Sequence, residues 1–222
     1  MKVAIIGAGI AGLTAAQKLQ QRGAQVTVFE KSRGTGGRLA NKRLDWATVD
    51  IGAQYFTARD ARFQQQVAAW EQAGAVARWE FTPYSCGAKG LTTRTDTTLR
   101  YVGIPSMNSL AHELTGKLGI NFSTRVETIK HFGAGWRLVM SDGDESEQVY
   151  DWVVLATPAE QSSELLTGSV LANKIPKRIH EPCWALALAT RGQVSPKVQG
   201  IFGDETVSWV SRLSSRPQHQ NT

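Results

Sequence analysis

The sequence predicts an α/β fold built around a parallel β-sheet, and two patterns near the N-terminus carry this prediction. Residues 3–6 are a short apolar run with β-branched side chains, typical of a strand buried on both faces of a parallel sheet. A glycine-rich turn and an apolar helical pattern follow, and residues 25–30 then form a second short strand that ends in an acid. The order strand, helix, strand is the unit from which parallel sheets are built.

The turn after the first predicted strand carries Gly7, Gly9 and Gly12 in a GxGxxG arrangement. Gly7 permits a tight turn, Gly9 lets a phosphate approach the main chain, and Gly12 lets the helix pack close to the strand. The N-terminus of that helix directs unpaired N–H groups and the positive end of its dipole to the same place. The pattern therefore predicts a site for a dinucleotide pyrophosphate.

An acid closes the second predicted strand. Glu30 stands eighteen residues after Gly12, close to the spacing of roughly 20 expected for a carboxylate that accepts a hydrogen bond from a ribose hydroxyl.

The alternative for the N-terminal apolar run is a signal peptide. A single lysine before the apolar run and the glycines within it argue against that alternative.

Composition limits the class of protein. The 222 residues are 41% hydrophobic and 20% charged, which suits one large or two small globular domains. The apolar runs are far shorter than the roughly 18 residues of a membrane span, so we expect no membrane contact. Cys86 and Cys183 form no CxxC spacing, so we expect two buried structural thiols in a cytoplasmic protein.

The charge pattern favours a small ligand over nucleic acid. The net charge is +6, but Lys and Arg are scattered and not clustered with aromatic residues. A cofactor or substrate rich in phosphate accounts for a basic balance. Four widely spaced histidines show no metal-ligand spacing, so we expect no metal site; they are His112, His131, His180 and His219.

The remaining pattern predicts an interrupted nucleotide domain. Helices are expected at 58–73 and after Ser106, a three-stranded meander at 126–131, 136–140 and 148–150, a buried strand at 152–156, and further strands at 184–190, 200–202 and 207–211. These elements predict a Rossmann-like domain from 1–57 and 102–158, a β-rich substrate domain from 58–101 and 159–212, and a disordered tail at 213–222.

A second glycine cluster follows the acid. After Glu30 and Lys31, the sequence reaches Gly36, Gly37 and Arg38, where backbone amides and a guanidinium make a second cradle for the pyrophosphate. In a nicotinamide-dependent domain, the chain usually continues from the acid that binds the ribose into another crossover helix. The E-K-x5-G-G-R arrangement resembles the flavoprotein amine oxidase superfamily, and this resemblance implies FAD as the cofactor.

Residues 50–57, DIGAQYFT, resemble the renalase-like family within that superfamily, and residues 103–107, 152–158 and 182–185 agree with it. The resemblance implies that the Ala11 backbone and Arg38 contact the phosphates, that Ala53 and Gln54 lie beside the flavin ring, and that the Val126 backbone meets adenine. A surface arginine and a satisfied buried amide are the alternatives for Arg38 and Gln54. The cofactor-binding residues predicted in full are Gly7, Gly9, Ala11, Gly12, Glu30, Lys31, Gly37, Arg38, Gly52, Ala53, Gln54 and Val126.

The resemblance also implies an activity. It is hydride transfer from a dihydronicotinamide dinucleotide to the flavin with oxygen as acceptor, and such a donor requires no acid or base, so no catalytic side chain is predicted. An amine oxidase or desaturase acting on another small molecule is the first alternative. Relatives continue into a glycine-rich segment that covers the flavin, so we expect the C-terminal part of the fold to be missing. A truncated, non-catalytic nucleotide-binding fragment is therefore the second alternative.

Overall fold

A computed structural model describes residues 1–88, 90–176, 180–192 and 194–218. The chain forms two compact units. Unit 1 consists of Met1–Leu39 and Ala111–Trp184, and unit 2 of Ala40–Leu110 and Ala185–Thr222. The predicted α/β class with a parallel sheet is confirmed in unit 1.

The sheet of unit 1 has the strand order β12-β1-β2-β9, and all its pairs are parallel. The strands are β1 (Lys2–Ile6), β2 (Gln25–Phe29), β9 (Gly119–Asn121) and β12 (Trp152–Leu155). The predicted strands at 3–6, 25–30 and 152–156 are thus confirmed, whereas β9 has too little apolar pattern to predict.

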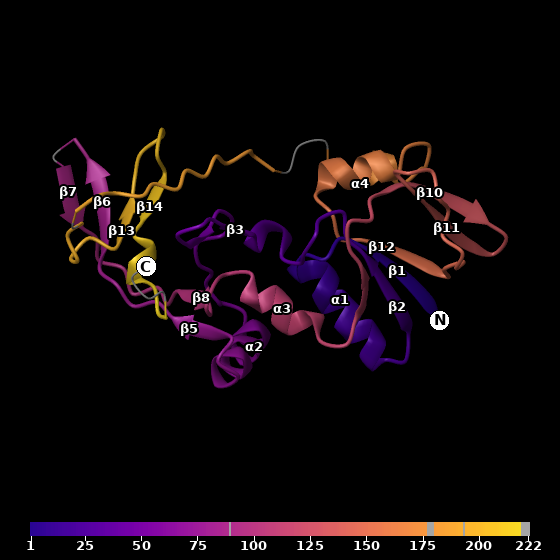
Figure 1. The fold of residues 1–222 in the computed structure, drawn as a ribbon, viewed down its shortest axis with the longest axis horizontal. Helices are drawn as coiled ribbons and strands as arrows, with labels where there is room; N and C mark the ends of the chain where they lie inside the picture. The colour runs from indigo at the N-terminus through magenta and orange to yellow at the C-terminus, as the bar shows by residue number, and fades with distance from the viewer. Residues whose placement is uncertain (89, 177–179, 193, 219–222) are drawn as a thin grey trace. The chain divides into compact units, whose positions relative to one another are not determined.

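Helix α1 (Ile10–Gln21) packs against β1 and β2 (Figure 1). Its buried residues are Gly12, Leu13 and Ala16, so the buried face lies in its first two turns. This placement brings the first turn of the helix close to the turn that precedes it.

The predicted meander is a two-stranded ribbon. Strands β10 (Val126–Phe132) and β11 (Gly135–Met140) pair antiparallel, but residues 148–150 form no third strand. The Ser146 hydroxyl accepts a hydrogen bond from the Leu138 N–H at 3.1 Å and donates one to the Gln148 carbonyl at 2.9 Å. A side chain therefore replaces part of the backbone ladder, and only isolated bridges remain, such as Trp136 with Tyr150.

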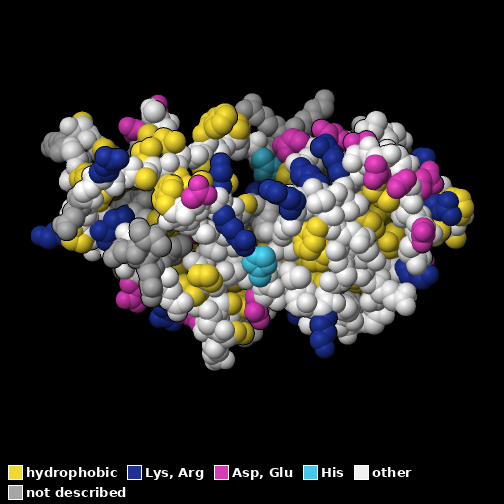
Figure 2. All heavy atoms as spheres, in the orientation of Figure 1, with side chains coloured by type: hydrophobic (Ala, Val, Ile, Leu, Met, Phe, Trp, Pro, Cys, Tyr) yellow, Lys and Arg dark blue, Asp and Glu magenta, His cyan; other side chains and the backbone are white. Residues whose placement is uncertain are grey.

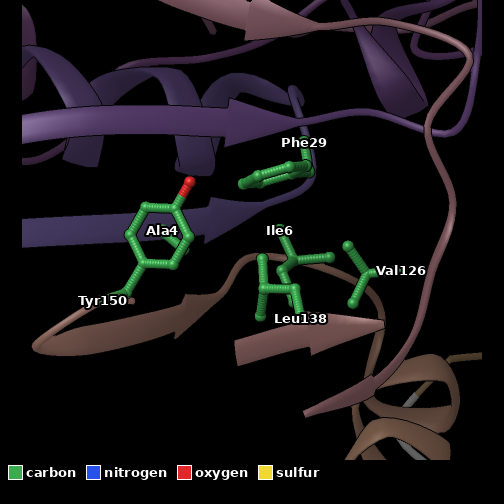
Figure 3. Close-up of a cluster of buried hydrophobic side chains, with 6 residues drawn as sticks. All are labelled: Ala4, Ile6, Phe29, Val126, Leu138 and Tyr150. Carbon is green, nitrogen blue, oxygen red and sulfur yellow. The ribbon is translucent and has the colours of Figure 1, made fainter. Parts of the chain in front are cut away.

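A cluster of buried side chains joins the ribbon to the sheet (Figure 3). Phe29 and Tyr150 meet edge to face with ring centroids 6.0 Å apart. The cluster joins residues from both sequence segments of unit 1. Its members are Ala4, Ile6, Phe29, Val126, Leu138 and Tyr150. The short helices of unit 1 are η1 (Gly37–Leu39), α4 (Ala159–Leu165) and η2 (Ala172–Lys174).

Unit 2 contains a four-stranded sheet of order β14-β13-β6-β7 and two smaller strand pairs. The sheet strands are β6 (Pro83–Gly87), β7 (Gly90–Thr93), β13 (Gly200–Phe202) and β14 (Trp209–Ser211). The pairs are β3 (Asn41–Arg43) with β4 (Thr48–Asp50), and β5 (Val76–Arg78) with β8 (Tyr101–Gly103).

The helix expected at 58–73 is α2 (Ala61–Gln72), with Val67 and Trp70 buried. It begins later because the Asp60 side chain caps it by accepting from the N–H groups of Arg62 and Phe63. The helix expected after Ser106 is α3 (Ser109–Thr115), which crosses the boundary between the units.

The unit boundaries differ from the predicted domains. Residues 40–57 and 102–110 belong to unit 2, and residues 159–184 belong to unit 1. Pairing of Phe56 with Tyr101 and hydrogen bonds from Asn41 to Ser106 and Asn108 hold the first two segments together. The prediction followed the order of motifs along the chain, whereas long-range pairing decides which unit a segment joins.

Three further expectations are wrong. Residues 184–190 form no strand, and both Cys86 and Cys183 are exposed free thiols. Part of the tail expected to be disordered is folded, because η3 (Leu213–Ser215) leads into a buried Arg216. Residues 219–222 of that tail, with His219, lie outside the described residues.

A buried ion pair anchors this part of unit 2. Arg216 Nη1 donates to Asp50 Oδ2 at 2.6 Å, and the two side chains are 0% and 1% exposed. The second Asp50 oxygen accepts from the Met107 N–H at 3.1 Å. Burial lowers the pKa of the Arg216 guanidinium, while Asp50 acts in the opposite direction and keeps it charged. The pair therefore fixes the end of β4 to residues more than a hundred positions away.

Replacing Arg216 with Ala should reduce the free energy of unfolding by about 3–5 kcal/mol, because it leaves the Asp50 charge buried without a counter-ion. Urea denaturation measures this loss. Arg62→Ala is the matched control: it breaks an ion pair with Asp60 in which Arg62 is 91% exposed, and it should cost less than about 1 kcal/mol. Equal losses in the two variants would contradict a structural role for the buried pair.

Candidate functional site

The turn between β1 and α1 requires glycine at two positions for reasons of packing. Gly7 has φ +107°, and its N–H donates to the Phe29 carbonyl at 2.8 Å. A Cβ added at Gly12 would lie 2.0 Å from the Gly7 carbonyl oxygen. Any side chain at Gly12 would therefore push α1 away from the turn, as the sequence pattern predicts.

Gly9 differs from these two glycines because no other atoms pack against the position that its side chain would occupy. It is the N-cap of α1 with φ −77° and ψ 175°, and a Cβ added there would meet no atom within 4 Å. No side chain caps the helix at this point, and Ala11 in the first turn is exposed. First-turn N–H groups have no acceptor within a helix, so this open space suits a phosphate group.

The second glycine cluster lies directly on the first. The Gly36 N–H donates to the Ala8 carbonyl at 3.1 Å, and Gly9 and Gly36 form a parallel bridge. A Cβ added at Gly37 would lie 3.4 Å from the Gly9 Cα atom, and Gly37 has φ +53°. Two clusters that are 27 positions apart, from Gly9 to Gly36, thus form one surface at the start of α1.

Two basic residues of this loop, Lys31 and Arg38, are predicted to bind the cofactor, and their contacts differ. Arg38 lies in η1 with an exposed side chain, and it makes no hydrogen bond or ion pair with any residue that the structure describes. The Lys31 ammonium donates to Gln161 Oε1 at 3.1 Å. Arg38 is therefore the more accessible of the two predicted cations.

Glu30 is buried, and its carboxylate holds the two loops together. Oε2 accepts from the Ala8 N–H at 2.7 Å, and Oε1 accepts from the Ser32 N–H at 2.8 Å. A carboxylate has about four acceptor sites, so these bonds leave capacity for a ribose hydroxyl. The sequence predicts only the ribose contact, because the position of the Ala8 N–H depends on the folded turn.

Val126, the predicted adenine contact, begins β10 and is buried in the cluster shown in Figure 3. Its backbone lies opposite Met140, and the register shifts between Val126 and Thr128. The side chain is therefore part of the core, and only the backbone of this residue is left for a ligand.

The predicted flavin-side residues Gly52, Ala53 and Gln54 lie in unit 2. The Gln54 amide nitrogen donates to the Asp50 carbonyl at 2.7 Å and to the Gly52 carbonyl at 3.0 Å, and its oxygen accepts from Ser211 and Arg216. These bonds are those of a satisfied amide. A role for Gln54 beside a flavin ring stays a prediction.

Other kinds of site have less support. Within the described ranges, no group of three or more His, Cys, Asp or Glu could hold a metal ion. The part of the chain that the structure describes contains no helix long and apolar enough to cross a membrane. On the face of unit 1 visible in Figure 2, acidic and basic side chains lie among one another. That mixed surface differs from the basic stripe typical of nucleic-acid binding.

Comparison with known proteins identifies the class of this fold. Residues 5–70 match the family model of the NAD(P)-binding Rossmann-like domain. A 52-residue stretch is 46% identical to 4,4'-diapophytoene desaturase (4,4'-diaponeurosporene-forming) of Staphylococcus aureus strain Newman, covering 23% of this chain and 10% of the desaturase. The N-terminal part of the chain is therefore similar to NAD(P)-binding Rossmann-like domains.

Solved structures extend the similarity in fold. A putrescine oxidase variant redesigned in cofactor binding has a TM-score of 0.60 at 16% identity, covering 74% of this chain and 59% of the oxidase. An Exiguobacterium sp. 255-15 protein assigned provisionally as a protoporphyrinogen oxidase has a TM-score of 0.62 at 15% identity, covering 78% and 62%. The fold of this chain is thus similar to the folds of these two oxidases, and the chain spans about three fifths of their length.

Replacing Glu30 with Gln should reduce the free energy of unfolding by about 1–3 kcal/mol, because an amide nitrogen would face one of the two buried N–H donors. Urea denaturation checks this. The control is Glu127→Gln, whose side chain is 54% exposed beside Arg125, and its effect should stay within about 0.5 kcal/mol. A Glu30 variant as stable as this control would show that the carboxylate does not hold the loops together.

Proposed function

We propose that this chain binds FAD at the paired glycine clusters and acts in an FAD-dependent oxidoreductase. The observation that carries this proposal is the bridge between Gly9 and Gly36 at the N-terminus of α1. At this bridge the backbones of the two loops meet beside the first-turn N–H groups of α1, which have no acceptor within the helix, and a pyrophosphate carries two charged groups that need such donors.

Three chemical parts of FAD have a fitting group in unit 1: the pyrophosphate, the adenosine ribose and the adenine. The first-turn amides of α1 and the open space at Gly9 receive the pyrophosphate, and the exposed Arg38 guanidinium approaches the same phosphates. The remaining acceptor capacity of Glu30 suits the adenosine ribose. The Val126 backbone at the start of β10 is the proposed adenine contact.

The second glycine loop favours FAD over a nicotinamide cofactor. After β2 the chain does not enter a crossover helix; it forms the loop from Glu30 to η1 and then passes to β3 in unit 2. That loop lies against Gly9, and we propose that its backbone and Arg38 supply a second set of donors to the pyrophosphate. A site for NAD alone needs only the first glycine cluster.

The proposed reaction follows from the resemblance of residues 50–57 to the renalase-like family. When bound, the flavin would accept a hydride from a dihydronicotinamide dinucleotide, with oxygen as the final acceptor. The protein's own part is to hold the cofactor through main-chain groups and Arg38. A cytoplasmic location is part of this proposal, because exposed free thiols such as Cys86 and Cys183 suit a reducing compartment.

An amine oxidase or desaturase is the second candidate, and the comparisons favour it as much as the first. The matched Staphylococcus protein is a desaturase, and the solved neighbours include putrescine oxidase. A non-catalytic fragment that only binds the nucleotide is the third candidate. The chain spans 59–62% of the length of the solved neighbours.

One spectroscopic experiment separates these candidates. The purified chain is loaded with FAD, and the visible flavin absorbance is followed without oxygen after addition of dihydronicotinamide isomers or of putrescine. Bleaching by the isomers alone supports the first candidate, and bleaching by the amine alone supports the second. Bound flavin that neither compound reduces supports the fragment. A chain that retains no flavin overturns the proposed cofactor.

Replacing Gly9 with Val should abolish FAD binding while the fold is kept. The backbone of Gly9 is extended and a Cβ has room, so a β-branched residue fits the free protein but fills the space of the pyrophosphate. Fluorescence titration with FAD measures binding, and circular dichroism checks the fold. Gly87→Val, at another open glycine position in unit 2, should bind FAD normally. Undiminished binding by the Gly9 variant would contradict the site.

Replacing Arg38 with Ala should weaken FAD binding by about 1.5–3 kcal/mol through loss of a charge-assisted contact with phosphate. The same titration gives the dissociation constants. Arg22→Ala is the control, because Arg22 is an exposed arginine at the opposite end of α1, and its dissociation constant should not change. If both variants bind FAD alike, Arg38 is only a surface residue.

A further inference from the structure

The second glycine loop contains a buried hydroxyl group without a hydrogen-bond partner. Most residues from 31 to 38 are exposed, but Thr35 is only 8% exposed. Its Oγ1 atom is buried and makes no hydrogen bond with any residue that the structure describes. The large majority of buried side-chain oxygens have such a partner, and a buried hydroxyl that has none destabilises the fold.

The other buried polar side chain of residues 30–38 is satisfied. Glu30 and Thr35 are equally buried, at 8% exposure each. The Glu30 carboxylate accepts from the N–H groups of Ala8 and Ser32, whereas the Thr35 hydroxyl has no such contact. The fold therefore supplies partners to the acid of this loop and none to its buried hydroxyl.

Thr35 lies at the place where the two glycine clusters meet. It directly precedes Gly36, whose N–H donates to the Ala8 carbonyl at 3.1 Å and which forms the bridge with Gly9. Neighbouring Cα atoms are about 3.8 Å apart, so the Thr35 hydroxyl lies within about 7 Å of the Gly36 Cα atom. The unsatisfied hydroxyl is thus close to the position proposed for the pyrophosphate.

A threonine hydroxyl can change its direction without a change of backbone. Its Cβ carries a hydroxyl and a methyl group of similar size, and a rotation of about 120° about the Cα–Cβ bond moves the hydroxyl into another staggered position. One such rotation puts the methyl group where the hydroxyl was, and a methyl group needs no hydrogen-bond partner. The hydroxyl is then free to donate to a phosphate oxygen, a charged acceptor that makes a strong hydrogen bond.

We propose that the Thr35 hydroxyl donates a hydrogen bond to the pyrophosphate of FAD and turns toward it when the cofactor binds. This inference rests on the FAD site proposed above. It adds a side chain to the glycines, Glu30 and Arg38 of the motif. Binding satisfies a group that the free chain leaves unsatisfied, so Thr35 strengthens cofactor binding at the expense of the stability of the free protein.

Thr35→Val tests the contact, because it replaces the hydroxyl with a methyl group of similar size. In a fluorescence titration, its FAD dissociation constant should rise about tenfold or more, since a hydrogen bond to a charged group is lost. ADP contains the adenosine and the pyrophosphate without the flavin, and its dissociation constant should rise by the same factor. Thr35→Ser keeps the hydroxyl and should bind both compounds within about threefold of the unmodified chain.

Urea denaturation without any ligand gives a second measurement. Thr35→Val should unfold at the same urea concentration as the unmodified chain or at a higher one, because it removes a hydroxyl that made no bond. Thr27→Val in β2 is the matched control, because the Thr27 side chain hydrogen-bonds the hydroxyl of the buried Tyr150. This control should unfold at a lower urea concentration and bind FAD normally.

The outcomes separate this inference from the proposed cofactor. If the unmodified chain and Thr35→Val bind FAD equally well, the hydroxyl is not a ligand, while the FAD site stands. Weaker binding of FAD but not of ADP excludes the pyrophosphate contact. A lower unfolding midpoint for Thr35→Val without ligand shows that the hydroxyl already has a partner in the fold, which also overturns the inference. A chain that binds neither FAD nor ADP overturns both proposals.

Discussion

The carboxylate of Glu30 is the interaction on which the candidate site depends. The glycines on either side of it contribute no side-chain contacts, so something else must hold the two loops in place. One oxygen accepts from Ala8 in the first loop and the other from Ser32 in the second, both within 2.8 Å. Hydrogen bonds to a buried charge contribute about 1.5–3 kcal/mol each. A surface made of backbone thus derives its rigidity from one acid, and the same acid is proposed to meet the ribose.

Sequence reasoning succeeds where the signal is local. The βαβ unit is predictable because buried parallel strands are continuous apolar runs and because the glycines have a fixed spacing. Sequence reasoning fails where the structure depends on contacts between residues that are far apart in the sequence. Arg216 pairs with Asp50 across 166 positions, and no local pattern marks this arginine as buried. Ser146 replaces ladder bonds that the meander pattern assigns to a third strand. The contacts of Glu30 with the two loops also cannot be predicted, because they depend on the conformation of the folded turn. The proximity of the two glycine clusters, in contrast, follows from the motif itself.

Unit 2 has its own constraint, the buried charge of Asp50. Its two oxygens bind Arg216 and the Met107 amide, and its carbonyl accepts from Gln54. The conformation of residues 50–54 is therefore set in part by two other stretches of chain, one at Met107 and one at Arg216. Because Arg216 also donates to Gln54, the segment that resembles the renalase-like family is fixed from the C-terminal side of unit 2. Any proposed contact of Gln54 with a flavin has to be compatible with these bonds.

The path of the chain through the two units has a consequence for its synthesis. Strand β1 pairs with β2 after about twenty residues, but its pairing with β12 starts with Val3 and Trp152 and has to wait until that part of the chain has been made. A ribosome adds about 5–20 residues per second, so the N-terminal strand waits on the order of ten seconds for its second neighbour. During that interval one apolar edge of β1 is open, while much of unit 2 is already being made. The nascent chain is therefore exposed to misfolding and to chaperones during this interval, until β12 has been made and pairs with β1.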